Sequence, residues 1–402
     1  MKSISNRKAF VIFIVFFIIV AGASVGVFAW LNLRGAGQVT SRPSDDITEI
    51  IRDGKNKTGF PLKLPAGFDI EIFAENVPGA RVLVQDALGN FWVSQTKKGI
   101  VSQITTSGES AFKPNLIFRD LNRPHGLAID PQDGTVLYIA ESNKISRVQL
   151  YSEASLEKIA DLPDGGRHFT RTIAFGPDNR LYVSIGSSCD TCMEDDERRA
   201  AIYSMNKDGS DFKQYATGLR NAVFFAWSEV DGRMWTTEMG RDFLNDDLPP
   251  DEINIIYEGE NYGWPFCYGT GTHDITFDIS QDAARFCANE ATPSYINLPA
   301  HVAPLGLAFV REEGWPQDMW YDLIVAEHGS WNRSEPVGYK LTRLKLDAAG
   351  NFLGEEDFIT GWLTEDGALG RPVDVLIQPG GIMYVTDDHA GVIYRITYQD
   401  TP

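Results

Sequence analysis

Histidine and arginine side chains recur at equivalent places in this sequence, each just before a short apolar segment. A neutral imidazole can accept a proton near physiological pH, and arginine can bind a carboxylate through two parallel hydrogen bonds. Each of these residues taken singly fits a structural contact, but together they predict a basic functional channel in a chain of net charge −19. They are His125, His168 with Arg171, Arg220 with Asn221, His301, and Arg371 with Asp374.

A repeat connects these positions. Each copy has an alternating apolar segment, a Gly, Asp or Asn turn, and then an aromatic and β-branched segment such as FWVS, LYIA, LYVS, MWTT, LIVA or MYVT. Period-two alternation of such residues indicates β-strands. The copies are 80–104, 124–150, 170–206, 221–257, 303–346 and 371–398.

The spacing of the repeat selects the fold. Copies begin about 45 residues apart except where insertions intervene, which is typical of a four-stranded propeller blade. A β-sandwich is the alternative, but a sandwich would not repeat one internal pattern six times. The sequence therefore predicts an all-β, six-bladed β-propeller over residues 59–402. In that fold the residues before each first strand converge at one end of the central channel.

The N-terminus predicts a membrane anchor. Lys2, Arg7 and Lys8 precede an apolar run over 9–33, with only Arg34 close behind it. The run exceeds the roughly 20 residues that cross a bilayer, and the charge bias places the N-terminus in the cytoplasm. We expect a single-pass anchor at 1–34, a flexible tether at 35–58, and a periplasmic or extracellular propeller. A cleaved signal peptide is the alternative.

Charge and cysteines narrow the function further. The net charge of −19 argues against nucleic acid as a partner, because phosphate binding needs clustered Lys and Arg. Outside the cytoplasm an even number of cysteines favours two disulfides. A four-thiolate zinc site and a redox-active C-x-x-C remain alternatives, although the spacing is not that of a zinc ribbon. The four cysteines are Cys189, Cys192, Cys267 and Cys287.

Several ordered motifs resemble the glucose/sorbosone dehydrogenase family over about 60–398. They are GGRHFTRTIAFGPDNRLYVSIGSSC, GLRNAVFFAW, DEINIIYEGENYGWP, HVAPLG, EHGSWNR and GRPVDV. The SSCDTC and HGSWNR segments look more like the sorbosone and pyranose dehydrogenase branch. The resemblance implies a six-bladed propeller that binds pyrroloquinoline quinone (PQQ) and oxidises a sugar hydroxyl of an aldose, sorbosone-like or pyranose substrate.

The resemblance also assigns roles. His168 matches the general base, while the cofactor performs the redox step and the protein supplies binding and orientation. The expected sugar contacts are His125, Arg171 and His301. The expected cofactor contacts are Arg220, Asn221, Arg371, His328, Trp331, Asn332 and Arg333, with Arg333 replacing a lysine of the glucose branch.

The resemblance also implies a calcium site. The family holds Ca²⁺ against PQQ with two successive backbone carbonyls, and the matching residues are Gly240 and Arg241. Asp247, Asp251 and Glu252, in a stretch that also contains Asp246, are candidates for a second Ca²⁺ site, because Ca²⁺ prefers hard oxygen ligands in a flexible loop. A solvated acidic loop is the alternative.

Two departures from the family pattern affect the pocket. The second arginine of the family's last-blade pair falls at Val373, and the glycine after the Arg-Asn pair is replaced around Phe224, which could narrow the channel. Other readings of the fold are a Ca²⁺-dependent lactonase-type hydrolase and a non-catalytic glycan- or protein-binding propeller. No C-x-x-C-H haem motif is present, so electrons would leave to a membrane quinone or a cytochrome.

Overall fold

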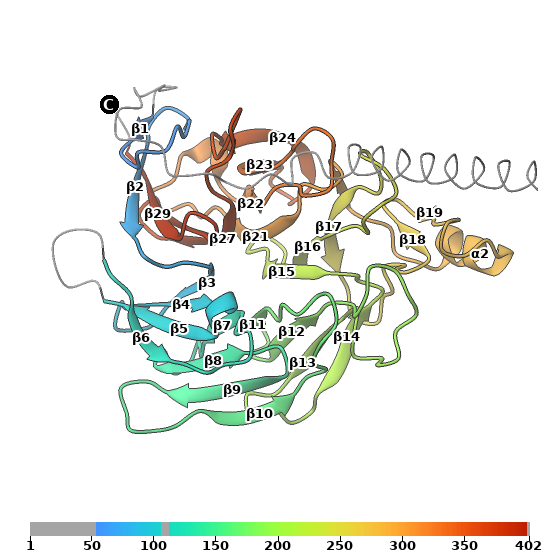
Figure 1. Ribbon diagram of the computed structural model, residues 1–402, viewed down its shortest axis with the longest axis horizontal. Coiled ribbons are helices and arrows are strands. Elements are labelled where there is room, and N and C mark those ends of the chain that lie inside the picture. Colours follow the sequence, from blue (N-terminus) through green and yellow to red (C-terminus); the bar gives the residue numbers. More distant parts are fainter. Residues whose placement is uncertain (1–53, 106–111, 400–402) are drawn as a thin grey trace, which may run out of the picture.

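The computed structural model describes residues 54–105 and 112–399. Six sheets, antiparallel apart from one short pair of strands, stand around a central axis, with β3, β7, β11, β15, β21 and β27 innermost (Figure 1). The predicted all-β six-bladed propeller is confirmed. The expected anchor at 1–34 and most of the tether lie outside the described residues. No helix in the described ranges is both long enough and apolar enough to cross a bilayer.

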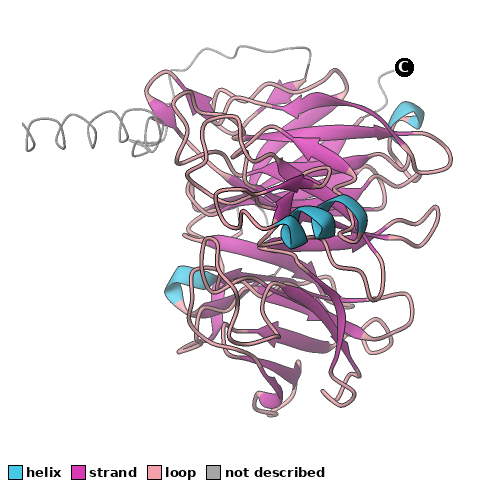
Figure 2. Ribbon diagram, turned by 90° about the vertical axis from the view of Figure 1, so that its right-hand side faces the viewer, coloured by secondary structure: helices cyan, strands magenta, loops and turns pink. Residues whose placement is uncertain are grey.

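Strands account for nearly all of the regular structure (Figure 2). Blade 1 contains β3 (Ala80–Gln85), β4 (Phe91–Gln95), β5 (Ile100–Ile104) and β6 (Asn115–Phe118). Blade 2 contains β7 (Gly126–Ile129), β8 (Val136–Ala140), β9 (Lys144–Gln149) and β10 (Glu157–Asp161). Blade 3 contains β11 (Ile173–Phe175), β12 (Leu181–Ile185), β13 (Ala201–Met205) and β14 (Lys213–Thr217).

The remaining blades complete the ring. Blade 4 contains β15 (Ala222–Trp227), β16 (Met234–Glu238), β17 (Asp251–Ile256) and β20 (Ile296–Leu298). Blade 5 contains β21 (Pro304–Phe309), β22 (Leu323–Glu327), β23 (Lys340–Leu346) and β24 (Phe352–Ile359). Blade 6 contains β27 (Pro372–Gln378), β28 (Ile382–Asp387), β29 (Val392–Tyr398) and, from the other end of the chain, β2 (Phe68–Ala74), to which β1 (Lys55–Asn56) adds.

The pairing of β2 with β29 closes the ring. Phe68 lies opposite Tyr398 and Ile70 opposite Ile396, so the first long strand serves as the outermost regular strand of the last blade. This pairing joins residues more than 300 positions apart in the chain. The repeat did not predict it, because the closing strand stands outside the six sequence copies.

Short elements are inserted between the strands of the propeller. Blade 4 carries β18 (Cys267–Tyr268), β19 (Thr272–His273) and helix α2 (Gln281–Asn289), which project to one side in Figure 1. Ser280 caps α2 by accepting a hydrogen bond from the amide of Ala283 at 3.1 Å. Short elements elsewhere are β25 (Leu363–Thr364), β26 (Gly367–Ala368), and the 3₁₀ turns η1 (Thr96–Lys98) and η2 (Gln317–Met319).

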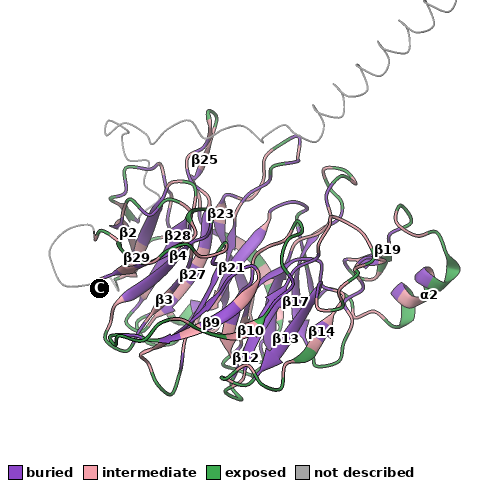
Figure 3. Ribbon diagram, turned by 60° about the horizontal axis from the view of Figure 1, so that its bottom comes forward, coloured by how far each residue is buried: buried purple, intermediate pink, exposed green. Residues whose placement is uncertain are grey.

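The second strand of each blade explains the repeated FWVS-like segments. Each blade stacks between two neighbours, so both faces of its middle strands are covered, and β4, β12, β16 and β22 are buried along their whole length (Figure 3). Aromatic and β-branched side chains suit a strand that is packed on both faces. The exposed residues gather in the connecting turns.

A hydroxyl at the end of the second strand joins neighbouring blades. Thr237 accepts a hydrogen bond from the amide of Phe224 in its own blade at 3.3 Å and donates to the carbonyl of Leu305 in the next blade at 2.8 Å. Ser94 does the same between blades 1 and 2, and Thr386 between blades 6 and 1. These hydroxyls satisfy backbone groups that the bulges at the start of the inner strands leave without ladder partners.

Apolar side chains fill the axis beneath the loop end of the channel. The rings of His125 in blade 2 and Phe224 in blade 4 lie 5.4 Å apart, and because these blades are not neighbours the contact crosses the axis. Phe224 and Val373 belong to one buried cluster with residues of the other inner strands. The narrowing expected at Phe224 is therefore present, and a ligand site must lie at the loop end.

Candidate active site

His168 lies in the loop that leads into β11, next to the end of β12. Its Nδ1 atom is 2.7 Å from the Oγ of Ser187 and 3.1 Å from the carbonyl oxygen of the same residue. The Ser187 hydroxyl donates its own proton to the carbonyl of Cys189 at 2.7 Å. Both partners of Nδ1 are therefore acceptors, so Nδ1 carries the proton and Nε2 presents a lone pair.

The Nε2 atom of His168 is placed to accept a proton. Within the described part of the chain it has no hydrogen-bond partner, and it is not among the fully buried polar atoms. Burial of the ring, together with the charges of Arg220, Arg167 and Arg171, holds the pKa of His168 well below 6.5. The imidazole is therefore neutral at pH 7, which is the state that a general base requires.

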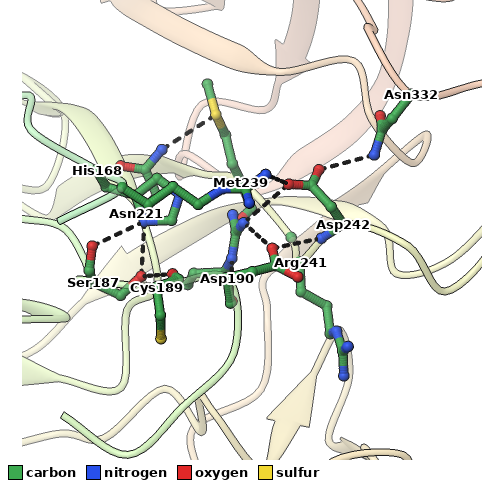
Figure 4. A network of polar contacts seen from close by, with 12 residues as sticks. His168, Ser187, Cys189, Asp190, Asn221, Met239, Arg241, Asp242 and Asn332 are labelled. Carbon is green, nitrogen blue, oxygen red and sulfur yellow. Dashed lines mark hydrogen bonds and ion pairs between the residues drawn. The ribbon is translucent and has the colours of Figure 1, made fainter. Parts of the chain in front are cut away.

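Arg220 and Asn221 lie beside this base at the start of β15. The Arg220 guanidinium donates to the carbonyl of Asp190 at 2.9 Å, to its carboxylate at 2.6 Å and to the carbonyl of Met239 at 3.1 Å. The amide nitrogen of Asn221 lies 3.3 Å from the sulfur of Met239, a weak acceptor that leaves this donor available to a ligand. The structure thus brings the predicted base and the predicted Arg-Asn pair together (Figure 4).

Asp242 joins this group to blade 5. It forms an ion pair with Arg167, lies 3.5 Å from Arg220, and accepts a hydrogen bond from the amide of Asn332 at 2.9 Å. Burial and the neighbouring carboxylate of Asp190 raise the pKa of Asp242, although Arg220 opposes this shift. Burial would also raise the pKa of Asp190, but Arg220, the Asp242 amide and Arg167 together outweigh burial and lower that pKa. Figure 4 shows this network extending from His168 to Asn332.

A second charged group lies where blades 5, 6 and 1 meet. Asp388 accepts from Nε2 of His328 at 2.8 Å and pairs with Arg81 at 3.0 Å. Burial lowers the pKa of His328 to about 4. Arg371 donates to the carbonyls of His328 and Gly329 and lies over the ring of Tyr339, and it forms no ion pair with the carboxylates that the structure describes.

These groups fit an anionic, planar cofactor. Four arginines lie in the two groups, namely Arg81, Arg167, Arg220 and Arg371. Among the described residues, Arg371 has no carboxylate within ion-pair distance and contacts two carbonyls and the Tyr339 ring. The Arg371 guanidinium, which no described carboxylate pairs, and the available Asn221 side-chain amide suit a ligand that carries several carboxylates, as PQQ does.

Two aromatic side chains line the rim. Trp331 and Phe243 are 38% and 40% exposed, and their rings meet edge to face at 5.7 Å. The Arg167 guanidinium lies 6.0 Å from the centre of the Trp331 ring. Arg333, expected to contact the cofactor, instead pairs with Asp247 at 3.0 Å and donates to the carbonyls of Asp246 and Ala300. In this structure Arg333 is a loop contact, and its role as a replacement cation stays a prediction.

Two of the three predicted sugar contacts are inaccessible. His125 is 0% exposed under Phe224, and burial holds its pKa well below 6.5. Arg171 is also 0% exposed and donates to the carbonyls of His168, Thr170 and Pro163. The structure therefore corrects both assignments: Arg171 holds the loop that carries the base, and His125 packs across the axis. His301, the third, is buried and bonded to the carbonyl of Asn245 at 2.8 Å.

The candidate second calcium site does not form. Asp251 accepts from the amides of Gly240 and Ala303, each at 2.8 Å, while Glu252 accepts from the amide of Gly269 at 2.6 Å. Burial raises the pKa of each to about 7. Adjacent strand residues point to opposite faces, so these two carboxylates diverge, and Asp247 pairs with Arg333. Gly240 and Arg241 lie in the loop after β16, and their role as Ca²⁺ ligands stays a prediction.

Both disulfides are present. Cys189 bonds to Cys192, and Cys267 bonds to Cys287. The zinc alternative is excluded for these four residues because every sulfur is in a disulfide. Cys189 lies within the candidate site, whereas Cys287 is on α2 in the blade 4 insertion.

Sequence reasoning missed four residues that the structure places in the site: Arg81, Arg167, Asp190 and Asp242. Arg81 had a signal, because it is the second residue of β3, near the start of blade 1, as His125 is near the start of blade 2. Arg167 directly precedes the predicted base. Asp190 and Asp242 had no signal, since only the folded chain brings them to Arg220.

Comparison with known proteins places the chain in a family. Residues 62–399 match the family described as TrAA12-like. A protein of Borreliella burgdorferi without an assigned function is 33% identical over 84% of this chain and 91% of its own length. A PQQ-dependent pyranose dehydrogenase of Coprinopsis cinerea is 23% identical over 72% of this chain, and the match spans 45% of that protein.

Solved structures share the fold. The PQQ domain of the Coprinopsis cinerea pyranose dehydrogenase superposes with a TM-score of 0.71 at 20% identity, covering 86% of this chain and 99% of that domain. A PQQ-bound aldose sugar dehydrogenase of Streptomyces coelicolor gives a TM-score of 0.61 at 18% identity, covering 84% and 100% of the two chains. The chain belongs to the TrAA12-like family of PQQ-dependent sugar dehydrogenase-type oxidoreductases.

Proposed function

We propose that this protein oxidises a hydroxyl group of an aldose, sorbosone-like or pyranose sugar, with PQQ as cofactor and His168 as general base. The observation that carries the proposal is the hydrogen bonding of His168. Nδ1 faces two acceptors at 2.7 and 3.1 Å, which leaves a lone pair on Nε2. Arg220 and Asn221 lie beside it, and such groups suit a ligand with carboxylates.

The protein's own residues account for the proton. Nε2 of His168 takes the proton of the reacting hydroxyl. The Nδ1–H group stays hydrogen-bonded to Ser187 and keeps the ring in its orientation. The charges of Arg220, Arg167 and Arg171 disfavour the imidazolium that results, so the ring returns its proton to solvent readily. PQQ, when bound, supplies the acceptor for the hydride that leaves the sugar carbon.

Cofactor binding falls to the arginines and to backbone groups. Arg220, Asn221 and Arg371 would hold the carboxylates of PQQ, and the backbone carbonyls of Gly240 and Arg241 would hold Ca²⁺. Trp331 and Phe243 offer apolar faces at the rim, where a sugar ring would enter. The expected external electron acceptor is a membrane quinone or a cytochrome. An anchor at 1–34 would keep the propeller on the outer side of the membrane.

The test is a titration of the full chain with PQQ, with and without Ca²⁺, followed by sugar-dependent reduction of an artificial electron acceptor. We expect tight, Ca²⁺-dependent binding and sugar-dependent turnover. No binding at micromolar PQQ would contradict the proposal and favour a hydrolase or a binding module on the same fold.

A further inference from the structure

One short segment touches the base, the Arg-Asn pair and the loop after β16. We call residues 186–192, from the end of β12 to Cys192, the disulfide turn, because Cys189 and Cys192 close it. At its start, a Cβ on Gly186 would lie 2.6 Å from the Cβ of His168 and 2.9 Å from Oδ1 of Asn221. The turn therefore passes between the base and the Arg-Asn pair, where Gly186 is packed too closely for a side chain.

The first half of the disulfide turn sets the orientation and tautomer of the base. The Ser187 hydroxyl oxygen accepts a hydrogen bond from Nδ1–H of His168, because the hydroxyl donates its own proton to the carbonyl of Cys189 at 2.7 Å. The amide of Ser187 donates to the carbonyl of Arg220 at 2.8 Å, and the amide of Arg167 donates to the carbonyl of Ser188 at 2.7 Å. If the Cys189 carbonyl moved, Ser187 could turn its proton toward the imidazole and the tautomer would no longer be fixed.

The second half holds the arginine. Asp190, between the two cysteines, accepts from Arg220 through both its carbonyl and its carboxylate, at 2.9 and 2.6 Å. The same carboxylate accepts from the amide of Asp242 at 3.0 Å. The turn thus connects the base to Arg220 and to the loop after β16.

The disulfide is a second restraint on this half, beside the contacts of Asp190 with Arg220 and Asp242. Among the described residues, none accepts a hydrogen bond from the backbone amides of 189–192. Buried backbone groups normally find such partners, and here these amides do not fix the chain. Both cysteines are half-buried.

We propose that the Cys189–Cys192 disulfide is a positioning element of the active site, which holds Asp190 against Arg220 and the Cys189 carbonyl against Ser187. This proposal rests on the proposed function for its effect on catalysis. Breaking the bond frees the turn, so that Arg220 loses its fixed partner and His168 loses its fixed tautomer. A dithiol reductant would do this by giving two electrons and two protons, which yields two cysteine thiols and oxidises the reductant to its disulfide.

The double variant C189S/C192S of the full chain tests the proposal. We expect PQQ affinity to fall by about tenfold or more, the scale for losing a hydrogen bond to a charged group. We also expect the pKa of His168, followed by NMR of its imidazole, to rise toward 6.5, because burial and Arg220 now hold it down. The charged groups that act on this ring are Arg220, Arg167 and Arg171.

The second disulfide supplies a matched control. C267S/C287S removes the same kind of bond from a loop of 20 residues, and the entropy of closing a longer loop stabilises the protein more. We expect this control to lower the melting temperature more than C189S/C192S does, without moving the His168 titration. If C189S/C192S leaves PQQ affinity within twofold of wild type and the His168 pKa unchanged, the disulfide is only a structural bond and the proposal is overturned.

Two further variants keep the test decisive if the double variant does not fold. Asp190→Asn removes the charge that holds Arg220, and Ser187→Ala removes the hydroxyl, the nearer of the two acceptors of Nδ1–H, and leaves the Ser187 carbonyl at 3.1 Å. Each should shift the His168 titration, and no shift in either would overturn the proposal. Should the wild type fail to bind PQQ, the proposed function fails, while the His168 titration still decides whether the disulfide turn positions the imidazole.

Discussion

The Nδ1 atom of His168 lies 2.7 Å from the hydroxyl oxygen of Ser187, whose proton is directed to the carbonyl of Cys189. One serine therefore decides which nitrogen of the imidazole is free to act as a base. Catalytic histidines are usually oriented by a group on their second nitrogen, and here that group is a hydroxyl rather than a carboxylate. The arrangement predicts how the base responds to substitution and to pH.

Replacing His168 with Ala should remove turnover and spare the cofactor. A positioned general base contributes about 10²- to 10⁴-fold to the rate, so kcat should fall by that factor while PQQ affinity stays within a few-fold. The measurement pairs a steady-state assay with a PQQ titration. His168→Gln is the control for shape, and we expect it to be equally inactive. Activity within a few-fold of wild type in either variant would show that another group is the base.

The acidic limb of the pH profile should lie below the usual histidine range. Burial and Arg220 lower the pKa of His168 well below 6.5, so the neutral base persists as the pH falls through 6.5. We expect kcat/KM to stay constant through that value and to drop only at lower pH, where the imidazole becomes protonated. An acidic limb centred at or above pH 6.5 would contradict this assignment.

Arg220→Ala should weaken PQQ binding by about 1.5–3 kcal/mol, the range for hydrogen bonds to charged groups. Arg220→Lys should recover only part of this loss, since an ammonium group cannot form two parallel bonds with a carboxylate. The control is Arg180→Ala, which removes a blade 3 arginine that pairs with Asp211 at 2.8 Å. Equal PQQ affinity in the wild type and in Arg220→Ala would refute the role of Arg220.

Gly186→Ala should damage the site without disturbing the blades. The added methyl group would lie 2.6 Å from the Cβ of His168 and 2.9 Å from Oδ1 of Asn221. We expect kcat/KM to fall by at least tenfold as these two side chains are displaced. Thermal unfolding serves as the check on the fold. Full activity in this variant would mean that the base and Asn221 need not be as close as the structure places them.

Thr237→Val should lower stability through the contact between blades 4 and 5. The hydroxyl accepts from the amide of Phe224 and donates to the carbonyl of Leu305, and Val leaves both groups buried without it. We expect a loss of about 1–3 kcal/mol in the free energy of unfolding, measured with denaturant. Ser210→Ala, at an exposed turn after β13, should change it by less than about 0.5 kcal/mol. Equal losses in both variants would refute the blade contact.

The fold was largely readable from the sequence. The predicted segments FWVS, LYIA and MYVT coincide with β4, β8 and β28, because middle strands packed on both faces need aromatic and β-branched residues. The exposed fourth strands carried a weaker pattern, and β2 stands outside the repeats although it completes the last blade. Its role depends on a pairing across the whole chain, which no local pattern records.

For the candidate site, too, the sequence predicted one part and only the structure decided the rest. The sequence by itself determined the chemical types: a histidine before β11, an Arg-Asn pair before β15 and four cysteines. Only the tertiary structure decided which of them act together, since side-chain direction depends on packing between blades. It buried His125 and Arg171, turned Arg333 to Asp247, and brought Asp190 and Asp242 to Arg220. Residue type is local information, whereas the partners of a buried charge are set by chain segments that meet only after the ring has closed.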